Sequence, residues 1–266
     1  MIRASGGRVL LRVEDHDRQR SRREFERGIL NDLDWLGFEP DEPRTDAFRA
    51  GPCVGRQSDR TSIYETALAR LRAAGVIYAC DCSRRALEPA PGPAERRYPG
   101  TCRDKGLAEL PGLGIRVRLD ASVERFTDLV HGELTQHPAD QCGDVLVRDR
   151  EGNWTYQFAV TVDDEAQGVT LVIRGDDLLQ STGRQIQLAR LLGRTSPPMF
   201  LHHPLVMKSA TQKLSKADGD TSVEDLRRSG WSAVDVIGEA AARVGLIHQR
   251  GRVHAGEVAA LFEVRS

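Results

Sequence analysis

The sequence predicts an α/β protein in which a largely parallel sheet is interrupted by a metal-binding insertion of α+β character. Three observations lead to this prediction. Strand-like apolar runs alternate with helical patterns along most of the chain, an order typical of a parallel sheet covered by helices. Three cysteines and a tyrosine gather between positions 80 and 102. The length of 266 residues is enough for a full core, in one large domain or two of ordinary size.

Composition excludes several classes of protein. No stretch approaches the ~20 apolar residues that span a bilayer, and the first seven residues contain no apolar signal core. A cytoplasmic protein with reduced cysteines and no membrane partner is expected. The net charge is −1, so nucleic-acid binding would have to use local basic patches at 18–27 or 84–105. On composition alone, solvated helix faces and loops explain both patches better.

The first third of the chain predicts one strand and two helices. Val9–Val13 is apolar and β-branched, which predicts a buried strand. Residues 21–24 have the pattern of a capping box, and apolar residues then recur at helical spacing until Gly37 ends the helix. A second helix is expected over 62–75, and it leads directly into the cysteine cluster.

The rest of the chain predicts further strands and then helices. Ile115–Leu119 alternates with a period of two, and Val145–Val147 precedes a strong turn, so both are expected to be strands. The segment from Thr155 to Ile173 also predicts strand, broken by the polar tract 163–168. A helix is expected from Ser181 or Thr182 to Gly193, and short helices over the last fifty residues.

The most informative pattern in the chain is a possible metal shell. Cys80, Cys82, Tyr98 and Cys102 form C-x-C, fifteen residues, then Y-x-x-x-C. Three thiolates and one phenolate oxygen can close a tetrahedral Zn²⁺ site. A disulfide is the alternative, but one intervening residue disfavours an unstrained Cys80–Cys82 bridge. The proline-rich insert 84–97 excludes a helix or central strand and predicts a loop.

Three further residues have the chemistry to hold a small charged substrate. Glu14 follows the first predicted strand, where ligands of open α/β sheets collect, and a carboxylate there can hold an ammonium group. An acidic loop that balances nearby arginines explains Glu14 equally well. Tyr156 and Arg174 flank the polar tract, and the planar fork of Arg174 suits a carboxylate. The alternative for Arg174 is an ion pair with the acidic residues at 176–177.

Two lysines and two histidines complete the candidates. Lys213 and Lys216 flank a serine and would form a cationic clamp for a polyphosphate, although basic surface loops often produce such a string by chance. His202 and His203 have no cysteine or carboxylate partner at metal spacing. We interpret both histidines as structural, or at most as lining a nucleotide pocket.

Six motifs follow one another along the chain: GGRVLLRVEDHD at 6–17, the cysteine and tyrosine cluster, WTYQFAV at 154–160, VDD at 162–164, VIRGDDLL at 172–179 and KLSK at 213–216. Taken in order, these motifs resemble the catalytic core of the class I glutamyl-tRNA synthetases. The resemblance covers Gly6 to about Leu226, and the short paralogues that act on queuosine in tRNA(Asp) are the best match, because the chain ends about fifty residues after its last motif.

The resemblance implies a fold and a set of roles. The fold is a Rossmann-like parallel sheet, with a zinc-bearing α+β insertion and a short helical C-terminal region. By position, Glu14 matches the residue that holds the glutamate α-ammonium group, while Tyr156 and Arg174 match residues that select the glutamate side chain. Lys216 matches the lysine that contacts ATP, with Lys213 beside it as a catalytic residue. The cysteine and tyrosine cluster matches the family's structural zinc ligands.

The implied activity is ATP-dependent glutamate activation. Glutamyl-adenylate would form from ATP, Mg²⁺ and L-glutamate, and the glutamyl group would then pass to the queuosine base in the anticodon of tRNA(Asp). Gln157 stands where ordinary glutamyl-tRNA synthetases tend to carry asparagine, which favours the paralogue. Two alternatives stay open: a non-catalytic zinc-bearing protein that binds RNA or glutamate, and the truncated core of an ordinary synthetase. A monomer is expected.

The start of the chain departs from the family pattern. The family opens with a strand, an R-F-A-P-S-like segment and a HIGH-type helix start, and the chain begins where that first helix should end. About thirty residues of a βαβ unit are therefore expected to be missing. A start codon assigned too far downstream is the favoured explanation, ahead of a fragment or a degenerate form. The chain as given is expected to show little glutamate-dependent exchange of pyrophosphate into ATP, and an extended form is expected to exchange without tRNA.

The motifs also predict four regions along the chain. The first half of the catalytic domain is expected over 1–75, and the zinc-bearing insertion over 76–145. The second half of the catalytic domain, with the KLSK loop, is expected over 146–225. The short helical region follows over 226–266.

Overall fold

Contacts divide the chain into two compact units. The computed structural model describes residues 6–17, 21–83, 88–89, 96–205 and 221–265. One unit contains the chain up to Asp15, residues 19–59 and the chain from Pro204 onward, and the other contains residues 16–18 and 60–203. The predicted division into four regions stays a prediction. No helix in the described ranges combines the length and the apolar character that crossing a membrane requires.

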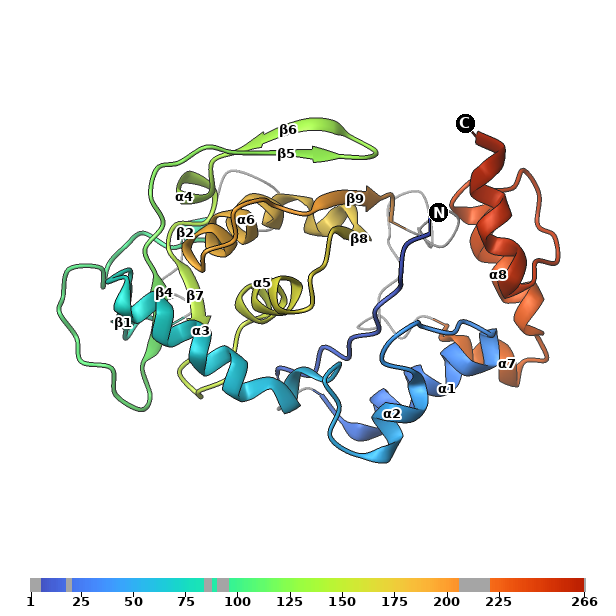
Figure 1. Ribbon diagram of the computed structural model, residues 1–266, viewed down its shortest axis with the longest axis horizontal. Helices are drawn as coiled ribbons and strands as arrows, with labels where there is room; N and C mark the ends of the chain where they lie inside the picture. Colours follow the sequence, from blue (N-terminus) through green and yellow to red (C-terminus); the bar gives the residue numbers. More distant parts are fainter. Residues whose placement is uncertain (1–5, 18–20, 84–87, 90–95, 206–220, 266) are drawn as a thin grey trace. The chain divides into compact units, whose positions relative to one another are not determined.

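The second unit contains a three-stranded antiparallel sheet (Figure 1). Its strands are β1 (Ile77–Cys80), β4 (Gly114–Val117) and β7 (Val145–Arg148), in the order β1-β4-β7. The predicted strands at 115–119 and 145–147 are confirmed. Val117 and Val147 are fully buried in the main core, with Ile115 and Val145 beside them. Cys80 therefore stands at the end of a strand that the core holds rigidly.

A four-stranded mixed sheet forms the other half of this unit. It contains β5 (Glu124–Asp128), β6 (Gly132–Gln136), β8 (Leu171–Gly175) and β9 (Met199–His203), in the order β6-β5-β9-β8. β8 pairs with β9 in parallel over five residues, and β5 also meets β9 in parallel. The mixed α/β class with parallel pairing is thus confirmed. The register places Arg174 opposite His202.

Helices cover the apolar faces of these strands. They are α3 (Thr61–Ala73), α4 (Pro138–Gln141), α5 (Tyr156–Ala166) and α6 (Thr182–Leu191), with the 3-10 helix η3 (Asp176–Ser181). The 3-10 helix η1 (Gln57–Arg60) spans the boundary between the two units along the chain. The predicted helices at 62–75 and 181–193 are confirmed. Tyr64, Leu68 and Leu71 bury one face of α3 against Phe158 of α5 and Leu188 of α6.

The strand predicted from Thr155 onward is wrong, because most of that segment is helix α5. Its strand-forming residues also have helical spacing: Phe158, Ala159 and Val162 share a face and are all buried in the core. The polar tract does separate two elements, because α5 ends within it at Ala166 and β8 begins at Leu171. Asp163 lies in the last turns of α5, fully buried, and accepts hydrogen bonds from Arg60 at 2.6 Å and the Tyr64 hydroxyl at 2.9 Å.

The first unit is mainly helical. It contains α1 (Arg23–Leu36), α2 (Thr45–Ala50), α7 (Val223–Arg228), α8 (Ala233–Arg243) and the 3-10 helix η5 (Ala255–Arg265). Gly37 ends α1 in the left-handed conformation, as predicted, with φ 76°. The capping box expected at 21–24 is wrong, because the helix begins after Arg22 and no side chain caps it. Capping boxes do start α7 and α8, at Ser222 and Ser232.

Two other predictions from the sequence need correction. Val9–Val13 is not a strand: Leu10 and Val13 each make a single parallel bridge, to Glu42 and Arg56, and the segment is only partly buried. Local β-propensity was not enough without a neighbouring strand to complete a ladder. The insert expected to be a loop contains a two-residue antiparallel pair, β2 (Glu88–Pro89) with β3 (Arg96–Arg97).

Candidate functional site

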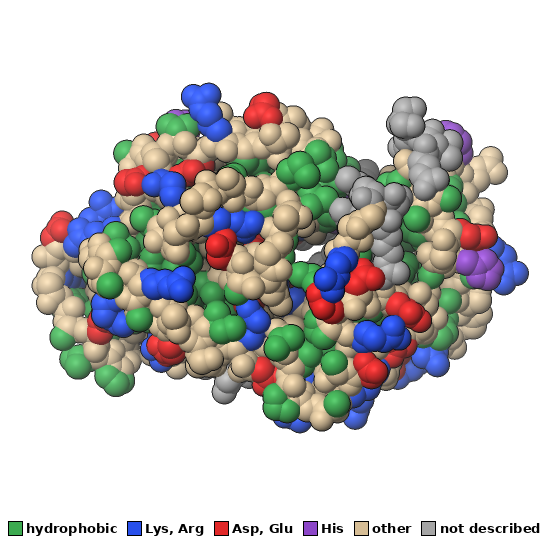
Figure 2. Space-filling model, in the orientation of Figure 1, with side chains coloured by type: hydrophobic (Ala, Val, Ile, Leu, Met, Phe, Trp, Pro, Cys, Tyr) green, Lys and Arg blue, Asp and Glu red, His purple; other side chains and the backbone are tan. Residues whose placement is uncertain are grey.

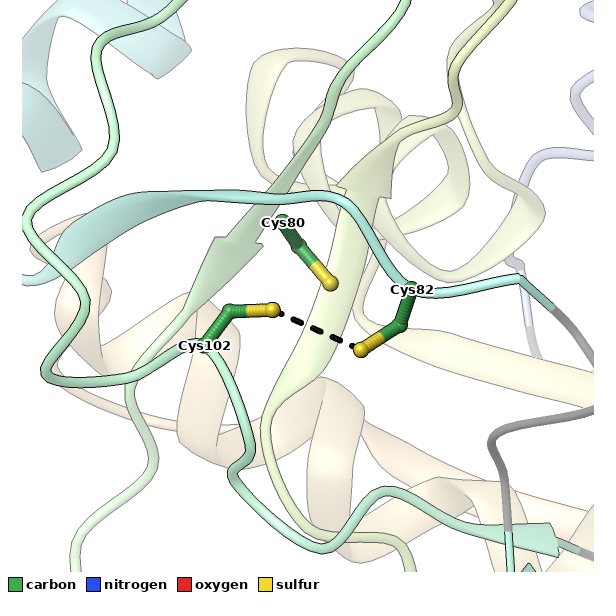
Figure 3. A group of neighbouring side chains, drawn as sticks. All are labelled: Cys80, Cys82 and Cys102. Atoms are coloured by element: carbon green, nitrogen blue, oxygen red, sulfur yellow. Dashed lines mark hydrogen bonds between the residues drawn. The ribbon is translucent and has the colours of Figure 1, made fainter.

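The three cysteines of the predicted metal shell meet in the second unit (Figure 3). Cys80 ends β1, Cys82 follows two residues later, and Cys102 comes from the turn after β3. Their sulfurs all lie within 4.8 Å of one another, and the Cys82 and Cys102 sulfurs are 3.4 Å apart. Ligand bonds of about 2.3 Å in a tetrahedral zinc site separate sulfurs by roughly 3.8 Å. The spacing therefore fits a metal shell, and all five cysteines of the chain are free.

Tyr98 supplies an oxygen at the same place. Its hydroxyl lies 3.6 Å from the Cys80 sulfur and accepts a 2.8 Å hydrogen bond from the Cys102 backbone N–H. Gly143 holds the backbone of Tyr98 closely: a Cβ at Gly143 would lie 2.1 Å from the Tyr98 carbonyl oxygen. Burial raises the pKa of the Tyr98 phenol, so the side chain can bind as a phenolate only beside a strong positive charge.

Arg116 provides positive charge under the cluster. Its Nε donates to the Cys80 sulfur at 3.3 Å, and its guanidinium lies 3.7 Å from the centre of the Tyr98 ring. Burial disfavours the Cys80 thiolate, but hydrogen bonds from Arg116 and Tyr98 leave the pKa of Cys80 below its usual value. Burial and the neighbouring thiols raise the pKa of Cys82 to about 11. Cys80 is therefore the cysteine of the cluster that loses its proton more easily than Cys82, and binding of a metal cation would displace the protons of the other ligands.

Sequence reasoning missed Arg116 and a second neighbour of the cluster. Asp81 accepts from the Cys102 thiol at 2.9 Å and from Lys105 at 3.0 Å. Asp81 lies inside the C-x-C motif, so its position was a usable signal. The sequence contains no signal for Arg116, because its place in the alternating pattern of β4 predicts an exposed side chain. In the structure this side chain is only 7% exposed.

A second candidate site surrounds Arg174, at the end of β8. Each of its three guanidinium nitrogens donates a hydrogen bond: Nε to His202 Nε2 at 2.9 Å, Nη1 to Gln185 Oε1 at 2.6 Å and Nη2 to Thr182 Oγ1 at 2.7 Å. Gln185 in turn donates to Gln157 Oε1 at 2.7 Å. Arg174 is therefore a fixed cation, held by β9 and the first turn of α6.

Tyr156 reaches the same network through the start of α5. It is the first residue of that helix and is partly buried, and the next residue, Gln157, makes the bond to Gln185. The His16 ring lies 6.0 Å from the Tyr156 ring. Tyr156 and Arg174 thus lie in one unit, and Gln157, the chain neighbour of Tyr156, is joined to Arg174 through Gln185. The planar cation of Arg174 can bind a carboxylate.

The remaining predicted residues are less completely placed. Glu14 belongs to the first unit, where Arg12 donates to its carboxylate at 3.4 Å, so its role with Tyr156 and Arg174 stays a prediction. Lys213 and Lys216 lie outside the described residues. His202 has a carboxylate partner that no spacing along the chain indicates: Asp128, 74 residues away, accepts from its Nδ1 at 2.7 Å. Only the pairing of β5 with β9 brings the two together.

Comparison with known proteins identifies the family. The catalytic domain described as tRNA synthetases class I (E and Q) matches residues 1–252. The chain belongs to this family. A member of it is a ligase that uses ATP with Mg²⁺, and the shared catalytic domain accounts for the predicted motifs appearing in the predicted order.

Curated members of the family match over most of the chain. A glutamyl-Q tRNA(Asp) synthetase of Rhodobacter capsulatus is 38% identical over 257 residues, covering 89% of this chain and 88% of the relative. One from Symbiobacterium thermophilum is 40% identical, covering 98% and 84%. A glutamate–tRNA ligase of Frankia casuarinae is 39% identical, but only 47% of that longer protein is covered.

A solved structure shows the same fold. A glutamate-tRNA synthetase from Elizabethkingia anophelis superposes with a TM-score of 0.71 at 24% identity, over 89% of this chain and 55% of that one. At this identity the likeness supports the class I synthetase fold alone. It agrees with the mixed sheet and the helices described above.

Proposed function

We propose that the protein activates L-glutamate with ATP and transfers the glutamyl group to the queuosine base in the anticodon of tRNA(Asp). The observation that carries the proposal is the match to glutamyl-Q tRNA(Asp) synthetases at 38–44% identity, with one relative covered over 88% of its length. The fixed Arg174 cation adds support, because a glutamate ligase needs a receptor for the side-chain carboxylate.

In this proposal, substrate recognition is divided among three residues. Arg174 binds the side-chain carboxylate, and Tyr156 contributes to its selection. Glu14 holds the α-ammonium group by a charge-assisted hydrogen bond. A substrate with a neutral amide in place of the carboxylate leaves the Arg174 charge unmatched, which would exclude glutamine.

The lysines of the KLSK motif would act on ATP during adenylate formation. Negative charge grows on the leaving pyrophosphate as the adenylate forms, and a positioned cation stabilises that charge. We assign this role to Lys216, with Lys213 beside it. Mg²⁺ would accompany ATP.

A zinc ion is the metal that best fits the cysteine and tyrosine cluster. Cys80, Cys82, Tyr98 and Cys102 would complete a four-ligand shell, and a closed shell leaves no position for substrate. Zinc would then stabilise the fold and take no part in the reaction.

Two other functions have less support. The core of an ordinary glutamyl-tRNA synthetase is favoured by the match to the Frankia ligase at 39% identity, whereas glutamyl-Q tRNA(Asp) synthetases match at up to 44%. A non-catalytic binding protein has no specific observation in its favour. We propose a cytoplasmic monomer, since its tRNA substrate is cytoplasmic.

Amino-acid-dependent exchange of pyrophosphate into ATP tests the activation step. The protein expressed from its natural gene should exchange with L-glutamate in the absence of tRNA, and should not exchange with L-glutamine or L-aspartate. Exchange that requires added tRNA, or that glutamine supports equally, would contradict the proposal.

A further inference from the structure

A buried carboxylate lies behind the Arg174 site and is not explained by packing. The Asp128 side chain is fully buried at the end of β5 and accepts four hydrogen bonds. Backbone N–H groups of Val130 and His131 donate to Oδ1 at 2.9 and 3.0 Å. The backbone N–H and the ring Nδ1 of His202 approach Oδ2 at 3.0 and 2.7 Å. Burial opposes ionisation, but these bonds hold the pKa of Asp128 below its usual value.

The ionised carboxylate fixes the state of the His202 ring. A carboxylate only accepts hydrogen bonds, so Nδ1 must carry the proton. The other nitrogen, Nε2, then presents a lone pair, and Arg174 Nε donates to it at 2.9 Å. His202 is completely buried, and burial keeps its pKa below the usual 6.5 even though Asp128 acts in the opposite direction. At neutral pH the ring is a neutral acceptor.

The tautomer decides whether Arg174 can adopt this orientation. Arginine has donors only, so a His202 ring with its proton on Nε2, or with two protons, would face Arg174 with a second donor. Thr182 Oγ1 also lies 3.3 Å from Nε2 and binds Arg174 Nη2. The chain of contacts therefore runs from a carboxylate to a histidine acceptor to the arginine.

We propose that Asp128 and His202 are positioning residues that orient the Arg174 guanidinium to receive the side-chain carboxylate of glutamate. The inference rests on the proposed function, because it takes Arg174 as the glutamate receptor. Neither residue touches the substrate. They affect glutamate affinity and discrimination against glutamine, because a guanidinium in the wrong orientation cannot form a bidentate pair of hydrogen bonds with a carboxylate.

This relay of contacts from Asp128 through His202 to Arg174 makes glutamate binding depend on pH. The charged groups that act on the His202 ring are Asp128 on β5, Arg174 on β8 and Asp176 of η3, and Asp176 is also bound by the His131 ring at 2.8 Å. Acidification through the pKa of His202 adds a cation next to Arg174 and removes its acceptor. Glutamate affinity should therefore be full at neutral pH and fall on the acid side of 6.5.

Calorimetric titration of the protein with glutamate tests the proposal. Asp128→Asn can reverse the His202 tautomer while preserving shape, so the Kd for glutamate should rise about 10- to 100-fold, the scale of a lost hydrogen bond to a charged group, with the KM for ATP unchanged. His202→Gln keeps an acceptor near the Nε2 position. It should show a smaller loss, and the acid-side pH dependence should disappear. Glu133→Gln, the same change at an exposed position of β6, is the matched control.

The variants distinguish an error in the positioning role of Asp128 and His202 from an error in the proposed function. If Arg174→Ala still binds glutamate, the glutamate site itself is misassigned. If Arg174→Ala loses binding while Asp128→Asn and His202→Gln bind normally, the relay is wrong and the function stands. Should Asp128→Asn fail to fold, nitrogen NMR of ¹⁵N-histidine-labelled unaltered protein decides. A buried ring protonated on Nδ1 alone is expected, and protonation on Nε2 would overturn the proposal.

Discussion

Arg174 is the residue on which the proposed selectivity depends. Its guanidinium is held on three sides by β9 and the start of α6, so little conformational entropy is lost when it binds a carboxylate. A fixed cation at the end of a strand is also expensive to leave unmatched. That cost is what would favour glutamate over neutral analogues.

Replacement of Arg174 tests this selectivity. Arg174→Ala should cost about 2–5 kcal/mol in kcat/KM for glutamate activation, because the substrate carboxylate loses its partner in a partly buried site. Arg174→Lys keeps the charge without the planar fork and should recover only part of the loss. Steady-state exchange kinetics give both values, and an alanine variant as active as the unaltered protein would refute the assignment.

Asp144 links acid stability to the strands beside the cysteine cluster. Its side chain is fully buried and binds Arg103, the Tyr78 hydroxyl at 2.5 Å and the Leu119 N–H at 3.0 Å. Burial raises the pKa of Asp144, but the hydrogen bonds lower it by more, so the pKa lies below 3.8. The carboxylate therefore stabilises the fold above that ordinary value, and the contribution disappears as the pH falls through the lower, folded value.

Asp144→Asn should reduce the free energy of unfolding at pH 7 by about 1.5–3 kcal/mol, the range for hydrogen bonds to a charged group. The difference from the unaltered protein should shrink as the pH is lowered below 4. Urea unfolding at several pH values measures both effects, with Asp140→Asn at an exposed position of α4 as control. A stability difference that does not change with pH would show that the charge of Asp144 is unimportant.

At the scale of single helices, replacing glycine with alanine is expected to have opposite effects on stability at two positions. Gly28 lies inside α1 with no atom near the position of a Cβ, so Gly28→Ala should stabilise by about 0.5–1 kcal/mol. Gly238 lies inside α8, where a Cβ would be 1.6 Å from the Gly251 carbonyl oxygen. Gly238→Ala should destabilise by about 1–3 kcal/mol despite the better helix propensity. Thermal or urea unfolding compares them, and equal effects would contradict the described contact.

The segment that contains Cys80, Cys82 and Cys102 is the part of the chain that a metal should stabilise. If zinc holds β1 to the turn at Cys102, Cys82→Ser should lower both the zinc content and the melting temperature, because metal binding is coupled to folding. Cys142→Ser, at a buried cysteine outside the cluster, should leave the zinc content unchanged. Elemental analysis of protein purified without chelators gives the content. A zinc-free unaltered protein would end the proposal.

The sequence was most reliable where a pattern and its physical cause are local. The strands around Val117 and Val147, the helix after Thr61 and the stop at Gly37 all follow from periodicity and backbone preference. Helix α5 was misread, because its β-branched and aromatic residues fit both periods and only packing against α3 decides.

Long-range partners could not be predicted from local patterns. The cysteine cluster was visible because its spacing encodes it. The contact between Asp128 and His202 spans 74 residues and exists only because β5 and β9 meet in the sheet. Arg116 was hidden in the same way, since nothing in its neighbourhood along the chain shows that its side chain reaches Cys80.

At the scale of the whole molecule, charge explains little of the recognition. Lysine, arginine and acidic side chains are interspersed over the face drawn in Figure 2, and the net charge is −1. Selection of one tRNA would therefore depend on the chemistry of the modified base and on local contacts, more than on a broad positive field. The vicinal diol of queuosine resembles the terminal ribose that ordinary synthetases acylate, which makes it a suitable acceptor.

Transfer of radiolabelled glutamate to purified tRNAs tests the central claim most directly. The protein from its natural gene, supplied with ATP and Mg²⁺, should label tRNA(Asp) that carries queuosine, and should not label queuosine-free tRNA(Asp) or tRNA(Glu). The label should stay with the anticodon fragment after nuclease cleavage. Labelling of tRNA(Glu), or of the 3′ end of any tRNA, would contradict the account and return the protein to the ordinary glutamyl-tRNA synthetases.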